Sequence, residues 1–292
     1  MRTVLFFLLA VPVAAAAQLK VASDTMLSSF THPESVGCDS KNKAIYVSEF
    51  GSKLAPLEKD GAGYISKWGL DGKLIEKNFL PGEKGEKLDK PKGIWVQGNR
   101  LWTTDIDSAW VFDLKTKKGR KVALPGAQFA NDPAVRGKAL YVTDNRSDQV
   151  YRVEPADFLN AKSEPKVSTV FKDAQVNPNG IWPGKSGLLV VGFLAADKPR
   201  AIYRLGKDGK PKAISDPIGR LDGVYELKDG SLLVTDWNSG SLFRWSKKMG
   251  MQKLAEGFKG PADFCVIARG KGMTAYVPDL VQSQVRIIGL TN

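Results

Sequence analysis

The sequence is poor in histidine and cysteine, which limits the chemistry that it can perform. Its 292 residues include one histidine, His32, and two cysteines, Cys38 and Cys265. A zinc site built from several histidines is therefore excluded, and a Ser-His-Asp triad could form only through His32. The cysteines are compatible with a disulfide bond or with two unpaired buried thiols, and the sequence leaves both alternatives open.

Long apolar segments are also missing once the N-terminus is set aside. Arg2 precedes an apolar run from Val4 to Val13, and four alanines ending at Ala17 supply an Ala-x-Ala cleavage site. This pattern indicates a secretory signal peptide at 1–17, since the run is too short to span a membrane comfortably. We expect cleavage after Ala17, a secreted or periplasmic protein, and no membrane span in the mature chain.

Acidic residues are outnumbered, which gives a formal net charge of +12. Basic proteins can bind nucleic acid, but this requires a groove-sized basic cluster with interleaved aromatic residues. Here the lysines are spread through turns, such as 117–118, 207–212 and 247–248. We expect a well-solvated surface and no nucleic-acid partner, with anionic small ligands as a minor alternative.

A repeated pattern runs through the rest of the chain. Six segments show apolar or aromatic residues followed by small or β-branched ones, and most end in an acidic residue: 44–49, 100–105, 139–144, 187–192, 231–236 and 274–279. Each follows a short Pro-, Gly- or Asn-containing motif, and an alternating segment comes after it. Four short strands in about 40–45 residues are typical of a propeller blade. The sequence predicts an all-β fold, a single six-bladed β-propeller over 18–292 with four-stranded antiparallel blades.

The sixth unit is one strand short. It contains three strands and ends near Gly289, whereas the mature N-terminus begins with a short strand-like segment around Leu19 to Ala22. We expect this N-terminal strand to complete the last blade, because such closure hides edge strands that would otherwise be exposed. We expect the closed ring to be a monomer.

The residues that open the first strand of each blade should form a ring at one mouth of the central channel. The ring members are Glu34, Lys92, Asn131 or Asp132, Asn179, Asp222, and Ala262 or Asp263. The set is rich in oxygen and contains neither sulfur nor imidazole, so it suits a hard cation such as Ca²⁺, Mg²⁺ or Mn²⁺. The alternative is that the Asn-Gly and Asp-Gly pairs serve turn geometry alone.

Acidic residues also recur at the end of the second strands. They are Glu49, Asp105, Asp144, Asp236 and Asp279. We interpret them as structural, since a carboxylate in this position can accept backbone N–H groups of the adjoining turn.

Four short motifs resemble one family of propellers. They are "PES" around Glu34, "ND" at Asn131-Asp132, "PNGIW" around Asn179 and "LDG" around Asp222. They resemble the regucalcin/gluconolactonase/luciferin-regenerating-enzyme-like (senescence marker protein-like) six-bladed propellers, along nearly the whole mature chain. The resemblance implies a divalent metal held by Glu34, Asn179 and Asp222, with Asn131 near metal and substrate. Ca²⁺ is favoured, and Mg²⁺, Mn²⁺ or Zn²⁺ are alternatives.

The sequence departs from this family at three points. Phe129 stands where the lactonases tend to have arginine, two residues before Asn131, and Pro133 replaces the glycine of the "NDG" motif. The first motif reads "ESV" instead of "EGP". In addition, the ammonium group of Lys92 could weaken metal binding in the ring or take the place of the metal.

These features predict a metal-dependent lactone or ester hydrolase acting on a small molecule. The metal would act as a Lewis acid, and Asp222 would be the catalytic base that takes a proton from water. Asn131 would orient the substrate, and Lys92 would meet an anionic group on it. The alternative is a non-catalytic propeller that binds a small ligand or a protein across the same face, since propellers host both functions.

Overall fold

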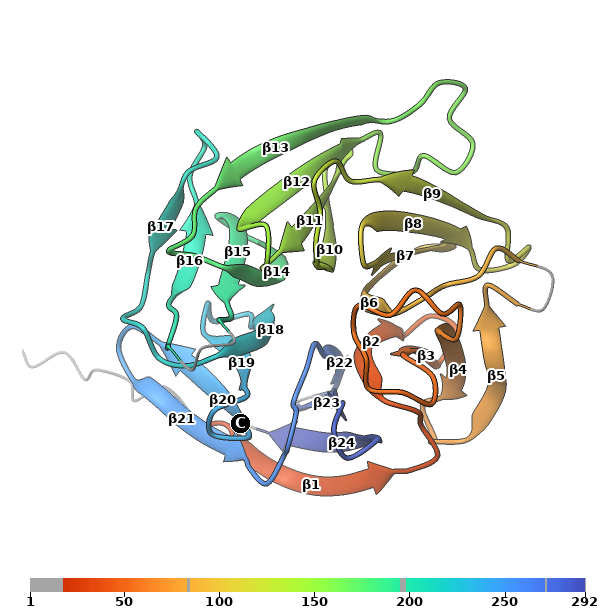
Figure 1. The fold of residues 1–292 in the computed structure, drawn as a ribbon. Coiled ribbons are helices and arrows are strands. Elements are labelled where there is room, and N and C mark those ends of the chain that lie inside the picture. The colour runs from red at the N-terminus through yellow and green to blue at the C-terminus, as the bar shows by residue number, and fades with distance from the viewer. Residues whose placement is uncertain (1–17, 83–84, 195–197, 271, 292) are drawn as a thin grey trace, which may run out of the picture.

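The computed structural model describes residues 18–82, 85–194, 198–270 and 272–291, so the predicted signal peptide lies outside the described residues. Within these ranges every regular element is a strand, and six sheets of four antiparallel strands surround one axis (Figure 1). The predicted six-bladed propeller is confirmed. None of the described segments forms a helix long and apolar enough to cross a membrane.

The strands run from the axis outward in each blade. The first blade contains β2 (Pro33–Asp39), β3 (Ala44–Glu49), β4 (Tyr64–Gly69) and β5 (Leu74–Leu80). The second contains β6 (Pro91–Gln97), β7 (Arg100–Asp105), β8 (Ser108–Asp113) and β9 (Gly119–Ala123). The third contains β10 (Ala130–Arg136), β11 (Ala139–Asp144), β12 (Gln149–Glu154) and β13 (Lys166–Lys172).

The fourth and fifth blades repeat this order. The fourth contains β14 (Pro178–Gly184), β15 (Gly187–Gly192), β16 (Ile202–Leu205) and β17 (Pro211–Ala213). The fifth contains β18 (Leu221–Glu226), β19 (Leu232–Asp236), β20 (Ser241–Ser246) and β21 (Gly250–Ala255). The sixth contains β22 (Cys265–Arg269), β23 (Gly272–Asp279) and β24 (Gln284–Thr291), with β1 (Lys20–Leu27) as its outermost strand.

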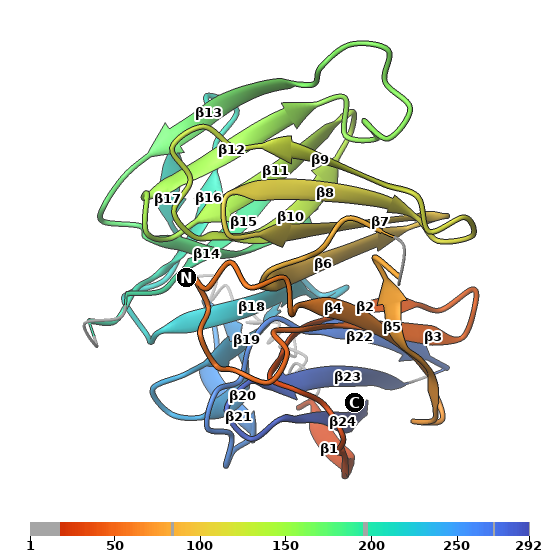
Figure 2. The same ribbon diagram turned by 45° about the vertical axis from the view of Figure 1, so that its right-hand side comes forward.

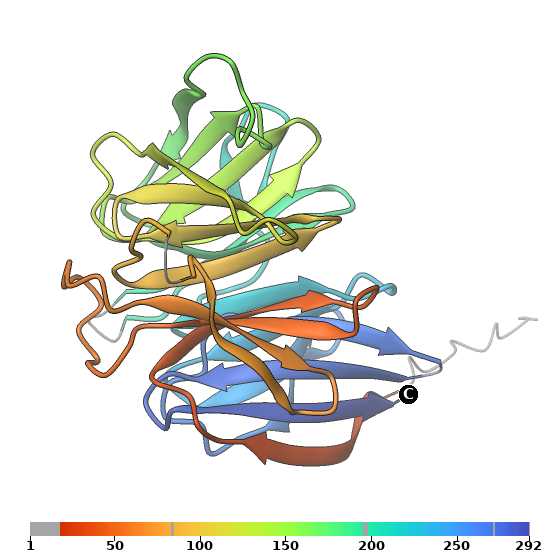
Figure 3. The ribbon, with the colours of Figure 1, turned by 90° about the vertical axis from the view of Figure 1, so that its right-hand side faces the viewer.

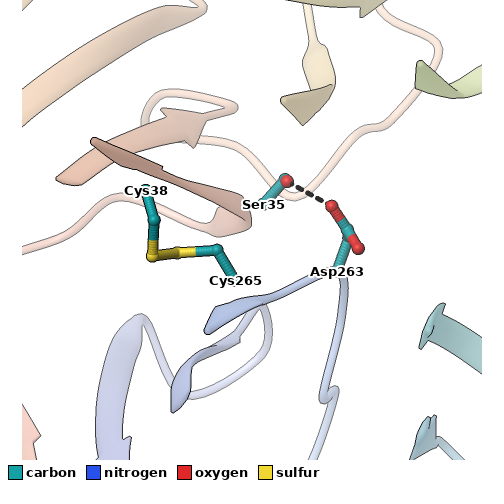
Figure 4. Close-up of a disulfide and its surroundings, with 4 residues drawn as sticks. All are labelled: Ser35, Cys38, Asp263 and Cys265. Carbon is teal, nitrogen blue, oxygen red and sulfur yellow. Dashed lines mark hydrogen bonds between the residues drawn. A yellow bond between two sulfur atoms is a disulfide. The ribbon is translucent and has the colours of Figure 1, made fainter. Parts of the chain in front are cut away.

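The N-terminal strand closes the ring as predicted. β1 pairs antiparallel with β24, with Lys20 opposite Thr291. The red β1 lies beside the dark blue β24 in all three views (Figures 1, 2 and 3). A disulfide bond between Cys38 of β2 and Cys265 of β22 joins the innermost strands of the first and last blades (Figure 4). The cysteines are therefore paired, and two connections secure the same junction of the ring.

The apolar core is divided among the blade interfaces. Buried clusters lie between each pair of neighbouring blades, and in one of them Trp102 and Val111 of the second blade pack against Leu140 and Val142 of the third. The second strand of a blade, such as β3, is buried along its whole length because it lies in the middle of a sheet covered on both faces.

A β-bulge marks the ring position in each of the first five blades. In the fourth blade Pro178 pairs with Gly192 and Ile181 with Val190, so Asn179 and Gly180 together face a single partner residue. A bulge re-aims the side chain that it carries, here the ring residue. A Cβ atom on Gly180 would lie 1.8 Å from the carbonyl oxygen of Asp222 in the next blade. The glycine of the repeated motif is therefore required by close contact between neighbouring inner strands.

A hydroxyl group on the second strand fixes the bulge. Thr143 Oγ1 accepts a hydrogen bond of 2.9 Å from the Asp132 N–H and donates one to the carbonyl oxygen of Asn179 in the next blade. Thr235 does the same in the fifth blade, where its hydroxyl accepts from Gly223 at 2.7 Å and donates to Ala262 at 3.1 Å. The Thr of the repeated pattern thus links neighbouring ring positions.

The acidic residues that end the second strands are structural, as interpreted. Asp144 accepts N–H groups of Gln128 at 2.7 Å and Phe129 at 3.0 Å, which lead into the inner strand β10. Asp236 likewise accepts the N–H groups of Arg220 at 2.8 Å and Ser239 at 2.9 Å. These carboxylates hold the chain at the point where it enters the ring.

Candidate functional site

Four of the predicted ring residues meet at one cavity at the mouth of the channel. Glu34 of β2, Asn131 of β10, Asn179 of β14 and Asp222 of β18 all line a cavity of about 570 Å³. Each of the four is at most 5% exposed. The bulges of four different blades therefore bring these side chains together, as the register of the repeats predicts.

Glu34, Asn131, Asn179 and Asp222 form what we call the floor of the cavity. Three oxygen atoms of this floor have no hydrogen-bond partner among the described residues. They are Glu34 Oε2, Asn131 Oδ1 and Asp222 Oδ1. Leaving a buried polar atom unsatisfied costs about 1–3 kcal/mol, so native proteins rarely do so without a reason. Because all three residues line one cavity, these atoms indicate a site that takes a ligand, an ion or ordered water.

The other atoms of the floor are held firmly. Asp222 Oδ2 accepts a 2.9 Å hydrogen bond from the indole N–H of Trp237. Asn179 Oδ1 accepts from the amide groups of Asn131 and, at 3.1 Å, Asn145, and its own amide donates to the carbonyl oxygen of Leu221 at 3.2 Å. Among the described residues, the side-chain oxygen of Asn131 has no donor, whereas that of Asn179 has two.

Burial dominates the electrostatics of the floor. It raises the pKa of Glu34 well above its usual value, and the negative charge of Asp222 adds to this effect. Burial and then the charge of Asp263 raise the pKa of Asp222 to about 7, against hydrogen bonds from Trp237 and Asn179 that lower it. Loss of hydration disfavours both carboxylates, and a positive charge in the cavity would favour them.

Lys92 belongs to the ring but lies behind the cavity wall. Its side chain is buried, with Nζ 4.4 Å from the ring centroid of Phe129 and 5.8 Å from that of Phe50. Nζ also donates to the carbonyl oxygen of Lys90 at 3.3 Å. Burial lowers the pKa of Lys92 to about 8, against the raising effect of nearby carboxylates, of which Asp105 is the strongest. Phe129 lines the cavity and Lys92 does not, so contact between Lys92 and a substrate stays a prediction.

Two further carboxyl groups lie deeper in the channel. Asp132 and Asp263 line a smaller cavity of about 180 Å³ between the inner strands. Ser35 Oγ donates to Asp263 Oδ2 at 2.7 Å (Figure 4), whereas neither oxygen of Asp132 has a partner among the described residues. Trp182 lines the same cavity and lies 5.3 Å from the ring of Trp95, two blades away, so aromatic rings pack across this part of the channel.

The cavity wall consists largely of residues that the sequence reasoning missed. Lining residues come directly after the second strand of five blades: Phe50, Asn145, Phe193, Trp237 and Leu280. We call these five residues the wall ring. In the second blade the same register holds Ile106, which is buried but does not line the cavity. The signal was present in the sequence, because each member follows the acidic or glycine residue that ends the repeated segment.

Other features limit the chemistry of the site. Within the described ranges no group of three or more His, Cys, Asp or Glu side chains is arranged to hold a metal, so a cation here would need amide oxygens as well. His32 is not among the cavity residues, and its Nδ1 lies 3.0 Å from the carbonyl oxygen of Gly51. A larger hollow of about 1060 Å³ lies at the outer edge of the molecule, lined by surface residues such as Glu76 and Lys117, and includes no ring residue.

The fold and the cavity define a six-bladed β-propeller with a polar site at one mouth of its channel. No protein-family model and no curated protein matches the sequence. Among solved structures, a protein described as a "putative gluconolactonase" superposes with a TM-score of 0.67 at 14% identity, over 94% of this chain and 98% of its own.

Virginiamycin B lyase from Staphylococcus aureus superposes with a TM-score of 0.62 at 16% identity, over 94% of this chain and 100% of its own. A streptogramin B lyase gives a TM-score of 0.60 at 14% identity, over 92% and 97%. These similarities confirm the resemblance to gluconolactonase-like propellers at the level of the fold.

Proposed function

We propose that the protein is an exported, metal-dependent hydrolase that opens a lactone or cleaves an ester, in the manner expected of gluconolactonase-like propellers. The observation that carries the proposal is that Glu34, Asn131 and Asp222 line one cavity at the channel mouth and that each has a buried oxygen without a hydrogen-bond partner among the described residues. Two carboxylates and amide oxygens are the donors that hard divalent cations such as Ca²⁺ prefer.

The residues fit such a cation. Glu34 and Asp222 would supply charge, and Asn179 would supply an amide oxygen, although Asn179 would have to exchange hydrogen bonds that it now accepts. When bound, the cation would polarise the carbonyl group of the substrate. It would also offset the loss of hydration that raises the pKa of both carboxyl groups.

The chain's own groups supply the proton transfer and the positioning. Trp237 fixes the orientation of the Asp222 carboxylate through Oδ2, which leaves Oδ1 without a hydrogen-bond partner among the described residues. Asp222 Oδ1 is thus placed to take a proton from the water that attacks the carbonyl carbon. Asn131, whose Oδ1 also has no partner among the described residues, would orient the substrate.

Arg146 offers a substitute for the family arginine that is missing at Phe129. Its exposed guanidinium lies 5.4 Å from the ring centroid of Phe129 and lines the cavity. A positive group is therefore available at this edge from a different position of the chain, and it could meet an anionic group of the substrate.

The alternative is a propeller that binds a small ligand in the same cavity without turnover. A lyase activity is not favoured. One lyase neighbour is described as catalytically inactive when a histidine is replaced by alanine. This chain has a single histidine, His32, which does not line the cavity.

Cation binding to the mature protein tests the metal. After treatment with a chelator, adding Ca²⁺, Mg²⁺, Mn²⁺ or Zn²⁺ should raise the melting temperature, since an ion at 100 times its Kd stabilises the folded state by about 2.7 kcal/mol. Glu34→Gln and Asp222→Asn should abolish the shift, whereas Asp107→Asn, a half-exposed carboxylate outside the ring, should keep it. If none of the cations raises the melting temperature, the proposal of a metal site is refuted. Lys92→Ala then tests whether the ammonium group of Lys92 takes the place of the cation.

Turnover separates the hydrolase from the binding protein. Simple aldonolactones, alkyl lactones and aryl esters should be hydrolysed in a reaction that chelation stops. Asp222→Asn should lower kcat by orders of magnitude, and Phe129→Arg should raise activity by adding a cation beside that of Arg146. Absence of metal-dependent turnover for both the wild type and Phe129→Arg would refute the hydrolase and leave the binding alternative.

A further inference from the structure

Four of the five wall-ring residues are apolar. Its members directly follow the strand end at the mouth of the channel. Phe50, Phe193, Trp237 and Leu280 occupy this register in four blades, and Asn145 is the exception. Pro56 and Leu194 add further apolar surface to the same cavity. Apolar residues in one register of separate blades therefore give the cavity a continuous apolar side.

The apolar wall is fixed before any ligand arrives. The backbone N–H groups of Phe50, Phe193 and Trp237 donate at 3.2, 3.0 and 3.0 Å to carbonyl groups just ahead of the inner strands. The rings of Phe193 and Trp237 meet edge to face with centroids 5.7 Å apart, and Trp237 is tied to Asp222. A preorganised apolar wall beside a polar floor is typical of a pocket for a ligand with one polar group and an apolar body.

Several polar side chains of the cavity are bonded to protein partners, whereas Arg146 is exposed. Asn177 Nδ2 donates to Asp148 at 2.6 Å, and Asn177 Oδ1 accepts from Arg200 at 2.7 Å. The amide group of Asn145 donates to Asn179. A polyhydroxylated sugar ring needs many hydrogen-bond partners, and burying its hydroxyl groups without them is unfavourable. The wall of the cavity is therefore poorly suited to a polyhydroxylated sugar.

Two exposed leucines lie on the connection that contributes Pro56 to the cavity. Leu54 and Leu57 lie on the same β3–β4 connection as Pro56, and they are 45% and 39% exposed. The cavity volume of about 570 Å³ is within the range of pockets for small organic ligands.

We propose that the ligand of this cavity is a lactone or ester with an aliphatic or aromatic substituent rather than a polyhydroxylated sugar lactone. This inference rests on the proposed function for the reacting group. It makes a separate claim about the remainder of the molecule, which binds against the wall ring and Leu194.

A homologous series tests the substrate class. With γ-lactones carrying alkyl chains of increasing length, kcat/KM should rise by about fourfold for each methylene buried, until the wall is covered. Gluconolactone should be a poorer substrate than the longer members. Equal or better turnover of gluconolactone would overturn the inference while leaving the hydrolase intact.

Binding without turnover separates this inference from the proposed function. The corresponding γ-lactams, which resist hydrolysis, should bind with an affinity that rises with chain length by calorimetry, even if no lactone is turned over. If neither kcat/KM for the lactones nor affinity for the lactams rises with chain length, the inference is refuted. Phe193→Ala and Leu194→Ser should each reduce the dependence on chain length, whereas Leu74→Ser, a 47% exposed leucine on β5 outside the cavity, should not.

Discussion

Reduction of the disulfide between Cys38 and Cys265 should destabilise the protein strongly, because the bond closes a very long loop. The two residues are separated by 227 positions. The chain-entropy relation gives about 5 kcal/mol for a loop of this size, which is an upper value because it assumes an unstructured reduced chain. For a chain of this length, such a loss corresponds to a fall in melting temperature of roughly 10–20 °C.

The assay compares oxidised protein, reduced protein and the double variant Cys38→Ser/Cys265→Ser in thermal and urea unfolding. The reduced protein and the double variant should agree, and the double variant should be insensitive to reductant, which controls for side effects of the reagent. The reduced protein should remain folded, since β1 still pairs with β24 and Ser35 still donates to Asp263 across the same junction. An unchanged melting temperature after complete reduction, verified by thiol titration, would refute the role assigned to this bond.

Removal of the closing strand β1 should add to the loss of stability caused by reduction of the disulfide. Deletion of 18–28 should lower the melting temperature, and it should cost more in the double cysteine variant than in the oxidised protein. The reason is that the strand and the disulfide secure the same pair of blades, and neighbouring interactions of this kind are not additive. Equal costs in the two backgrounds would show that they act independently.

Four further changes test the account of the ring and its closure. Gly180→Ala should destabilise by about 1–3 kcal/mol or more, since the new Cβ meets backbone. Thr143→Val should cost about 1–3 kcal/mol by leaving its two backbone partners unsatisfied. In urea unfolding, Leu19→Ala should cost about 2–5 kcal/mol, whereas the exposed Val21→Ala should stay within about 0.5 kcal/mol. Burial raises the pKa of Asp263 to about 7. In the presence of chelator, the wild type should therefore lose stability relative to Asp263→Asn as the pH rises from about 4 to 7. A difference in unfolding free energy between the two proteins that stays constant over this range would contradict this.

The fold could be predicted because the repeats carry both the period and the register. Residues that open the first strand, such as Asn179 and Asp222, are equivalent in every blade, so the sequence alone predicts that they meet at the axis. The closing strand followed from a count of strands in the last unit. These features depend on backbone geometry, which the pattern of apolar and turn residues specifies locally.

Properties that depend on side-chain packing could not be obtained in this way. The pairing of Cys38 with Cys265 requires the distance between two blades that are far apart in sequence. The position of Lys92 behind Phe129 depends on how a long side chain folds back under an aromatic ring. The free oxygen of Asn131 and the occupied oxygen of Asn179 result from a hydrogen-bond network that involves Asn145, a residue outside the repeated motifs.

The wall ring was missed for a different reason. The interpretation of the acidic residues that end the second strands as structural is correct, but it assigns no role to the residue that follows each of them. Because the acidic side chain anchors the backbone, as Asp236 does for Arg220 and Ser239, the next side chain is held at the mouth of the channel. Trp237 is in that position, and its indole group reaches back to Asp222. A structural repeat can therefore position a binding surface one residue away.

Stability and binding should be linked in this protein through the charges along its axis. Glu34, Asp132, Asp222 and Asp263 are carboxyl groups whose pKa burial raises. The nearby cation of Lys92 is itself disfavoured by burial, which lowers its pKa to about 8. Ionised together, these groups would carry an excess of negative charge in a poorly hydrated channel, so the folded protein must keep some of them protonated or bind positive charge.

Any ligand that supplies positive charge to the channel would stabilise the fold by linkage, whether or not it is turned over. Thermal stabilisation can therefore identify what the cavity binds, and it is the hydrolysis of the alkyl lactones that distinguishes an enzyme from a binding protein.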